Sequence, residues 1–453
     1  MDFTSILNEI KPTSKEKKKI KDMSNEILDY LNFLIKKENI EAEAIVVGSV
    51  SKGTYLKGKS DIDIFISFPL SSSIEMLKET GLFLAYKCSD YFNGEASEHY
   101  ASHPYLTSEI NGFEVDFVPC YKISSASQLK SAVDRTILHT NYVKKHLKEC
   151  QKDDVLLLKR FMDCTGTYGS EFKVGGFAGY LCEMLIVYYG SFEETLRNAS
   201  NWNYGEIIDL ENYQTSELFN DPLVAIDPTD ENRNVAAALR LDKMAEFIQS
   251  SRNYLKSDNK IDYFHKPKSK NSRKDLIKEF DERESEIIAV EFEIPEIPLD
   301  TLHPQLKKTV NSIAEQLDKN NFKVFNHDYW TDEENFGIFI FEMSNTKISK
   351  VEVNYGPKVF YKKACQQFID AHGIENCYIK GEFLVKNIIR EDNTAEKFIV
   401  NLLDNNISKI KVGKNLQDIL IETYSFIDIE KIENPHFWNF LDDFQNPGKF
   451  IRR

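Results

Sequence analysis

The chain has 453 residues, which is enough for roughly two to four domains, and 42% of them are hydrophobic, which is ample for packed cores. Its formal net charge is −15. That balance argues against a protein that holds nucleic acid by positive charge over its whole surface, so any nucleic acid must meet local basic patches.

The cysteines and the apolar segments bear on the compartment of the protein. The 7 cysteines are odd in number and contain no CxxC pair, which indicates buried thiols in a reducing compartment rather than disulfides or a zinc site. The first residues lack a signal-peptide core, and no stretch of about 18 or more apolar residues follows. We therefore expect a soluble, cytoplasmic protein with no membrane partner.

The first 140 residues predict a small α/β domain, the catalytic head in our interpretation. Thr13 and Glu16 have capping-box spacing, and they precede a run with apolar residues at helical intervals: Ile20, Met23, Ile27, Leu31 and Leu34. The lysines of this helix, 15–21, indicate a solvated face more often than a phosphate-binding patch. Strands are predicted at 45–47, 61–66 and 113–118.

Residues 141–255 predict a mostly helical second domain. Apolar residues recur at helical spacing around Leu157 and Leu181, and a further helix is expected from Val235 to Ile248. The basic stretch Lys266 to Lys274 is typical of an exposed linker.

Residues 256–453 predict an α+β region. A strand at 291–294, a helix at 306–317 and strands at 337–342 and 348–353 give a β-α-β-β order, typical of small RNA-binding sheets, within a sheet-containing part at about 285–360. The fold class expected is therefore a multidomain α+β protein.

Three carboxylates stand out in the head. Side chains alternate along a strand, so Asp61 and Asp63 share a face opposite Ile62 and its like-facing neighbours. Two carboxylates so close repel each other unless a cation lies between them, and Mg²⁺ prefers such oxygen ligands together with substrate phosphates. Asp116 interrupts an apolar strand, where an unpaired charge is costly. If the two strands are neighbours, all three acids converge.

This set has the composition that nucleotidyl transfer needs. Two metal ions roughly 4 Å apart can activate an attacking hydroxyl and neutralise the leaving pyrophosphate. Gly48 and Ser49 allow backbone N–H and hydroxyl groups to approach a triphosphate, and Lys52 adds positive charge.

Five segments in order resemble a known family, the archaeal-type (class I) CCA-adding tRNA nucleotidyltransferases of the DNA polymerase β superfamily. They are GSVSKGTYLKGKSDIDIFISFP, HPYLTSEINGFEVDFVPCYKI with SAVDRTILHT, YGSEFKVGGFAGYLCEMLIVYYGSF and DPTDENRNVAAAL. The likeness covers about residues 45–240. It implies a polymerase β-like head, a helical neck and a C-terminal tRNA-binding body.

The resemblance also implies roles for individual residues. Asp61, Asp63 and Asp116 become the metal ligands, although the family often has Glu at the first position. Ser49 and Lys52 lie at the triphosphate, where the family often has Arg in place of this Lys. The family also often has Tyr where Phe172 stands. Further residues implied to face the nucleotide are His103, Thr136, His139, Lys159, Tyr168 and Arg233.

Four of these assignments have an ordinary structural alternative. Lys159 could be a surface lysine, Tyr168 a core residue, His139 a structural histidine and His103 part of a turn. Arg233, just before the expected helix at Val235, could meet a phosphate or a base edge at that helix N-terminus.

The implied function is template-independent addition of C, C and A to the 3′ end of tRNA from CTP and ATP, with two Mg²⁺ ions and release of pyrophosphate. The family includes homodimers. Two alternatives remain: another nucleotidyltransferase with the same head, such as a poly(A) polymerase or an oligoadenylate-synthase-like enzyme, and a non-catalytic RNA-binding protein.

Overall fold

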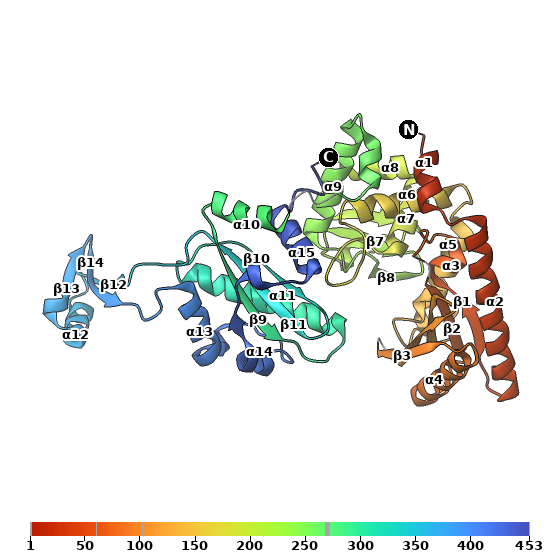
Figure 1. Ribbon diagram of the computed structural model, residues 1–453, viewed down its shortest axis with the longest axis horizontal. Helices are drawn as coiled ribbons and strands as arrows, with labels where there is room; N and C mark the ends of the chain where they lie inside the picture. The colour runs from red at the N-terminus through yellow and green to blue at the C-terminus, as the bar shows by residue number, and fades with distance from the viewer. Residues whose placement is uncertain (1, 60, 101–103, 268–271, 453) are drawn as a thin grey trace. The chain divides into compact units, whose positions relative to one another are not determined.

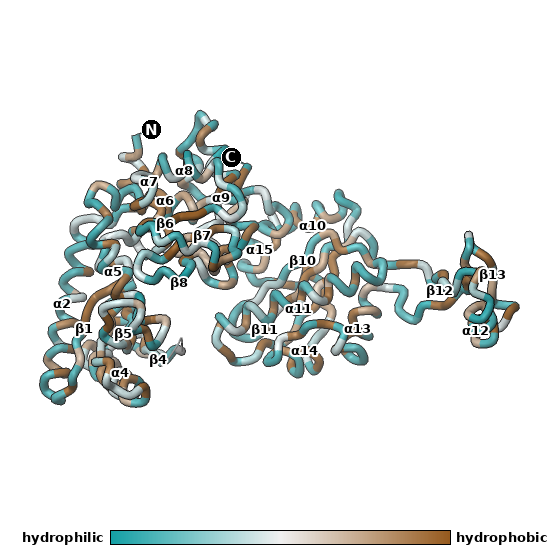
Figure 2. Tube along the Cα trace, turned by 180° about the vertical axis from the view of Figure 1, so that it is seen from behind, coloured by the Kyte–Doolittle hydropathy of each residue, from teal (hydrophilic) through white to brown (hydrophobic). Residues whose placement is uncertain are grey.

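The computed structural model describes residues 2–59, 61–100, 104–267 and 272–452, with only the backbone of Tyr100. The chain forms two compact units, residues 1–268 with 448–453, and residues 269–447 (Figure 1). Hydrophobic stretches run along the strands and inner helices of both units (Figure 2). Among the described residues, none of the helices has the length and apolar character that crossing a membrane requires.

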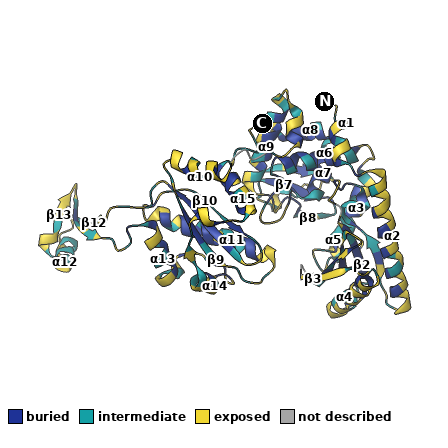
Figure 3. Cartoon of the chain, viewed as in Figure 1, coloured by how far each residue is buried: buried dark blue, intermediate teal, exposed yellow. Residues whose placement is uncertain are grey.

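Unit 1 begins with a five-stranded sheet. Its strands run in the spatial order β1 (Glu43–Val46), β2 (Ile62–Phe68), β5 (Phe113–Tyr121), β4 (Pro104–Ile110) and β3 (Glu95–Tyr100). The long helices α2 (Ser14–Lys37) and α4 (Ile74–Tyr91) pack on one face of this sheet, with exposed outer faces and buried inner ones (Figure 3). The capping box predicted at Thr13 and Glu16 is confirmed, and all five apolar residues predicted on the α2 face are buried.

The alternation of side chains along β2 and β5 separates a core face from an open face. Ile62, Ile64 and Ile66 lie in the core formed with α2 and α4. Phe65 and Val118 lie on the opposite face, in a smaller apolar cluster. Because every second residue of a strand shares a face, Asp63 and Asp116 belong to that second face.

The rest of unit 1 contains further helices and a second sheet. The helices are α1 (Thr4–Ile10), α3 (Gly48–Lys52), α5 (Arg135–His146), α6 (Gln151–Cys164), α7 (Gly179–Tyr189), α8 (Phe192–Ala199) and α9 (Leu241–Lys256). A three-stranded sheet, β6 (Glu206–Asp209), β7 (Leu223–Asp227) and β8 (Asp230–Asn234), lies within the region expected to be mostly helical. The helix expected from Val235 begins six residues later, at Leu241, because residues 235–238 form turns after β8.

Unit 2 contains two sheets. The larger one has the order β10 (Val324–Thr331), β11 (Phe336–Met343), β9 (Glu286–Glu293) and β15 (Ser425–Phe426), and the smaller one has the order β12 (Val351–Lys358), β14 (Phe383–Ile389) and β13 (Cys377–Lys380). The helices are α10 (Arg273–Glu282), α11 (Leu299–Lys319), α12 (Lys362–His372), α13 (Ala395–Asn405), α14 (Gln417–Thr423) and α15 (Pro435–Gln445).

The predicted β-α-β-β order is present in the larger sheet, but its strands differ in part from those expected. The strand after α11 is β10, which the sequence reading overlooked, and the segment expected as the last strand falls in β12 of the smaller sheet. The division of the chain into domains at residues 140 and 255 stays a prediction.

Candidate active site

Asp63 and Asp116 are direct neighbours on the open face of the head sheet. Strands β2 and β5 pair in parallel, with Asp63 in register with Asp116. On the other side of β5, Thr107 of β4 is in register with Asp116 and donates a hydrogen bond of 2.6 Å from its hydroxyl to the carboxylate. Asp61 is exposed and directly precedes β2. The strand pairing thus brings together the acids that the sequence separates by more than fifty residues.

The electrostatics of the pair favour a bound cation. Burial, and after it the negative charges of Asp116 and Asp61, raise the pKa of Asp63 to about 7, although Lys52 opposes the shift. Burial also raises the pKa of Asp116, against the hydrogen bond from Thr107. Both carboxylates are therefore costly to ionise next to each other, and a divalent cation removes that cost.

Gly48 brings the backbone into contact with Asp63. Gly48 is the first residue of α3, and it has a φ of +66°, which side chains rarely tolerate. A Cβ atom at this position would lie 1.8 Å from the Asp63 Oδ2 atom. The glycine is thus required by close packing of the α3 backbone on the carboxylate.

The donor set of this cluster fits a hard divalent ion. Within the described ranges, no group of three His, Cys, Asp or Glu side chains is already arranged to hold a metal ion. Three carboxylates facing one point repel one another before a cation arrives. Mg²⁺ is commonly held by one or two carboxylates plus substrate phosphates, so the pair Asp63 and Asp116 matches a site that the nucleotide completes.

A buried ion network lies beside the cluster. Lys52 at the end of α3 donates to Glu183 of α7, with 2.6 Å between Nζ and Oε2. The Thr54 hydroxyl donates to the other oxygen of Glu183, at 2.5 Å. Lys159 of α6, 3% exposed, donates to the Thr54 carbonyl at 2.9 Å and lies 3.8 Å from Glu183. Lys159 is therefore a buried lysine and not the surface lysine of the alternative interpretation.

Glu183 remains ionised in spite of its complete burial. Burial raises its pKa, but the charges of Lys52 and Lys159 and the hydrogen bonds from Lys52 and Thr54 outweigh burial, so the pKa lies below its ordinary value. Burial lowers the pKa of Lys159, and the charge of Glu183 opposes that shift. Two lysine side chains thus meet at this one carboxylate, and both can donate hydrogen bonds to an anionic ligand.

Tyr168 lies close to this network. It forms an isolated bridge with Phe177, and its hydroxyl and the Lys159 Nζ atom would lie 3.2 and 3.4 Å from a Cβ atom placed at Gly179, the first residue of α7. Tyr168 is partly buried against the core of this region. Its hydroxyl and the ammonium group therefore meet at one helix N-terminus.

His139 and Arg233 share one buried partner. The Nε2 atom of His139, on α5, and the Nη1 atom of Arg233 lie 2.7 and 2.9 Å from Asp227 Oδ2. The His139 ring stacks on the Tyr180 ring, with 3.9 Å between the ring centroids. The Lys52 ammonium lies 5.8 Å from the centroid of the Tyr180 ring. The expectation that Arg233 lies at a helix N-terminus is wrong, because the residue belongs to β8.

The positions of the other predicted residues give less information about a role in nucleotide binding. Ser49 lies in α3 beside Gly48, where its carbonyl accepts from the Thr54 N–H at 3.0 Å. Thr136 is the second residue of α5, one turn before His139. His103 lies outside the described residues. Phe172 is 48% exposed.

Two partner residues were missed from the sequence. Glu183 is the single charge within the apolar run of α7, and Asp227 ends the wholly buried strand β7. A lone carboxylate in an apolar segment was the available signal, since such a charge needs a partner. The sequence did not show which cations would supply it.

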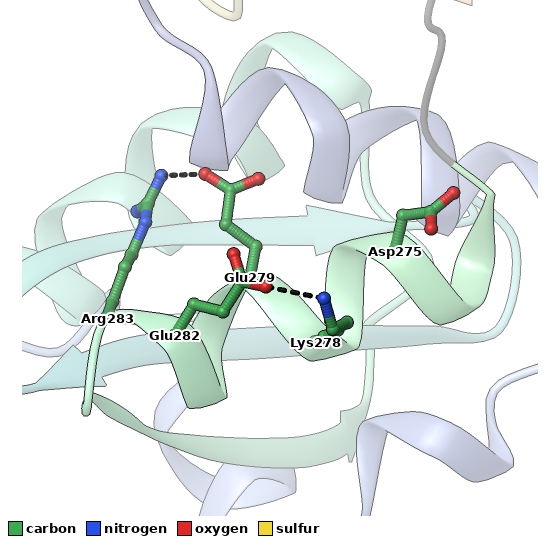
Figure 4. Close-up of a pocket in the computed structure, with 5 residues that line it drawn as sticks. All are labelled: Asp275, Lys278, Glu279, Glu282 and Arg283. Atoms are coloured by element: carbon green, nitrogen blue, oxygen red, sulfur yellow. Dashed lines mark hydrogen bonds and ion pairs between the residues drawn. The ribbon is translucent and has the colours of Figure 1, made fainter.

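A hollow of about 490 Å³ on α10 is also lined by charged side chains (Figure 4). Its side chains pair along the helix, Lys278 with Glu282 at 2.6 Å and Arg283 with Glu279 at 2.5 Å. Such pairs at helical spacing satisfy each other in solvent. This hollow is therefore a solvated helix face rather than a ligand site.

Family descriptions match three consecutive parts of the chain. They are the nucleotidyltransferase domain at residues 24–139, the second domain of tRNA nucleotidyltransferase at 153–265 and the C-terminal domain of the CCA-adding enzyme at 283–428. The polymerase β-like head expected from the sequence is thereby confirmed.

Similar proteins match along the whole chain. The CCA-adding enzyme of Methanothermobacter thermautotrophicus is 43% identical, over 100% of this chain and 99% of its own length. That of Methanosarcina acetivorans is 37% identical over 96% of each. A solved structure of a cytoplasmic RNA terminal U-transferase is 15% identical with a TM-score of 0.46, over 59% of this chain and 98% of its own, and that likeness is too weak to carry an argument. From the full-length identities, the chain belongs to the family of archaeal CCA-adding enzymes.

Proposed function

We propose that Asp63 and Asp116, with Asp61 beside them, form the metal-binding centre at which this enzyme adds C, C and A to the 3′ end of tRNA. The observation that carries this assignment is the in-register pairing of Asp63 and Asp116, with the pKa of Asp63 raised to about 7. The activity itself follows from membership of the family; the assignment of residues is our proposal.

Mg²⁺ is the ion we propose, in two copies, since its preference for carboxylate and phosphate oxygens matches the donors present. Bound there, it supplies charge to the attacking and leaving oxygens of an in-line displacement. The terminal ribose hydroxyl of tRNA attacks the α-phosphorus of CTP or ATP, the bond to the bridging oxygen breaks, and pyrophosphate leaves.

Lys52 and Lys159 are the proposed triphosphate ligands. The meeting of both lysines at Glu183 supports this role, since a triphosphate is the anionic part of both substrates. Ser49, Thr136 and Tyr168 are proposed to complete the phosphate and sugar contacts. Gly48 lets the α3 backbone approach the same region.

Arg233 and His139 are the proposed base-proximal residues. They line, with Tyr180, a cavity of about 440 Å³ on unit 1. That volume lies within the range of small-ligand sites.

For tRNA, the proposed contact surface includes the aromatic-basic segment of residues 355–363 in unit 2. Phe360 is 76% and Tyr361 63% exposed, and Lys358, Lys362 and Lys363 flank them. Exposed aromatic rings among cations suit stacking on unpaired bases together with phosphate contacts. We further propose a homodimer and a cytoplasmic location, the latter from the seven free thiols.

Incorporation assays test the assignment of the acids. The wild-type protein, freed of metal by chelation and resupplied with Mg²⁺, is given tRNA lacking its CCA end and each nucleotide singly. Asp63→Ala and Asp116→Ala should each reduce incorporation to background while tRNA binding stays nearly unchanged, because the carboxylates serve the chemistry. Glu109→Ala, an exposed acid on β4 of the same sheet, is the matched control and should leave incorporation unchanged.

Three outcomes would each contradict one of these assignments. Activity that survived removal of Asp63 or Asp116 would overturn the metal centre. Long runs of A from ATP alone on this tRNA would instead favour a poly(A) polymerase. Failure of Mg²⁺ to restore activity where Mn²⁺ did would reassign the ion only.

A further inference from the structure

Asp227 accepts four hydrogen bonds although its side chain is completely buried. The Oδ2 atom receives the Nε2–H of His139 and the Nη1–H of Arg233, at 2.7 and 2.9 Å. The Oδ1 atom receives the backbone N–H and the hydroxyl of Thr229, at 2.9 and 2.8 Å. A carboxylate held by four donors on its two oxygens has a fixed orientation, and it fixes its partners in turn.

The charge state of Asp227 is equally fixed. Burial raises its pKa, but the hydrogen bond and charge of His139 and the hydrogen bonds from Thr229 lower it to about 2. Asp227 is thus an anion at any working pH. Burial lowers the pKa of His139, against the hydrogen bond and charge of Asp227, so the ring is neutral near pH 7 and donates from Nε2.

The two groups that Asp227 holds lie at one cavity. His139, Tyr180, Asn232 and Arg233 are among the residues that line it. The Arg233 side chain is 33% exposed, and the structure gives one of its five N–H donors, on Nη1, to Asp227. The Tyr180 hydroxyl is buried and has no hydrogen-bond partner among the described residues.

An arginine fixed at this place can distinguish the two correct bases from the two wrong ones. Guanidinium groups donate hydrogen bonds and accept none. Cytosine and adenine each carry a ring-nitrogen acceptor beside their exocyclic amino group, at N3 and N1. Uracil and guanine carry an N–H donor at the same ring position. A rigid donor therefore pairs with the ring nitrogen of C and A. Against U and G it faces another N–H donor, so both donors are left without an acceptor.

We propose that Asp227 is the positioning residue for nucleotide selection: it holds Arg233 against the cavity so that the free N–H edge meets the ring-nitrogen acceptor of C or A and rejects U and G. This inference rests on the proposed role of Arg233 at the nucleotide base. His139, stacked on Tyr180, supports the same arrangement from α5.

The test is Asp227→Asn, which keeps the shape of the side chain but removes its charge and one acceptor oxygen. The values of kcat and KM are measured for CTP and for UTP on tRNA lacking its CCA end. The ratio of kcat/KM for CTP over that for UTP should fall about 10-fold or more, through a higher KM for CTP and a gain for UTP. Asp230→Asn is the matched control, since this carboxylate lies on the adjoining strand β8 and pairs with Arg135; its ratio should equal the wild-type ratio.

A second variant covers the case in which Asp227→Asn does not fold. Thr229→Val removes one hydrogen bond to Oδ1 and leaves the carboxylate in place, so it should lower the ratio in the same direction by a smaller factor. Thermal unfolding of every variant is recorded alongside. A general loss of stability lowers both kcat/KM values together and leaves their ratio unchanged.

The outcomes separate this inference from the function on which it rests. Wild-type protein that adds C, C and A, combined with an unchanged CTP-to-UTP ratio in folded Asp227→Asn and Thr229→Val, would overturn the role of Asp227 alone. If Arg233→Lys also left the ratio unchanged, the base contact of Arg233 in the proposed function would fall with it.

Discussion

Asp63 and Glu183 are carboxylates of unit 1 whose pKa values move in opposite directions. Glu183 lies between two lysines and a hydroxyl, so its negative charge is balanced inside the protein. Asp63 lies beside another acid, and its pKa rises to about 7. Neighbours of opposite charge produce a satisfied ion pair, whereas neighbours of like charge produce a site that needs a cation.

The titration of His139 gives a prediction about pH. Its folded-state pKa lies below the ordinary 6.5 because of burial, so the unfolded chain binds a proton more readily and stability falls as the pH drops below about 6.5. His139→Gln keeps an N–H donor for Asp227 but does not titrate.

The free energy of unfolding, measured by urea denaturation between pH 8 and pH 5.5, should fall more steeply for the wild type than for His139→Gln. The difference in slope is at most about 1.4 kcal/mol per pH unit. Taking the difference between the two proteins cancels the other titrating groups. Parallel curves would show that His139 does not titrate in this range.

At the scale of elements, local patterns predicted helices more securely than they predicted strand partners. The face of α2 and its capping box followed from spacing and cap chemistry within one segment. Strand β10 was overlooked because its polar residues, Asn326, His327 and Asp328, are partly buried by partners from elsewhere in unit 2. Strand β8 was expected to lead into a helix, since its sequence DENRN has no alternation of apolar and polar residues. It forms a strand by pairing with β7, which the local sequence does not indicate.

The aromatic-basic segment, residues 355–363, carries a prediction at this scale. Phe360→Ala should weaken tRNA binding by about 5- to 30-fold, the effect of removing one stacked base contact. The dissociation constant for CTP should stay unchanged. Filter binding of labelled tRNA measures the first quantity, and equilibrium dialysis the second.

Phe325→Ala is the matched control for this variant. Phe325 is 66% exposed on β10, in the other sheet of the same unit, so the chemical change is identical. It should bind tRNA as the wild type does. Equal losses in both variants would mean that general exposure of apolar rings, rather than this segment, determines the affinity.

For the whole molecule, the net charge of −15 sets a condition on tRNA binding. An acidic chain holds tRNA through local cations, so counterion release should dominate the affinity. The logarithm of the dissociation constant for tRNA should rise linearly with the logarithm of KCl concentration between about 50 and 200 mM, by several tenfold steps if several phosphates are neutralised. The KM for CTP should respond less, because Lys52 and Lys159, its proposed ligands, are buried. An affinity for tRNA that is insensitive to salt would contradict binding through phosphates.

The sequence by itself determined the chemistry of the acids, the periodic faces of the helices and, through the ordered motifs, the family. Those properties depend on residues within one segment, where periods of 3.6 and 2 fix which side chains point together. The tertiary structure decided which segments meet: the register of Asp63 with Asp116, the pairing of Glu183 with Lys52 and the pairing of Asp227 with His139. Pairings between residues more than fifty positions apart depend on strand register and helix packing, which no local pattern encodes.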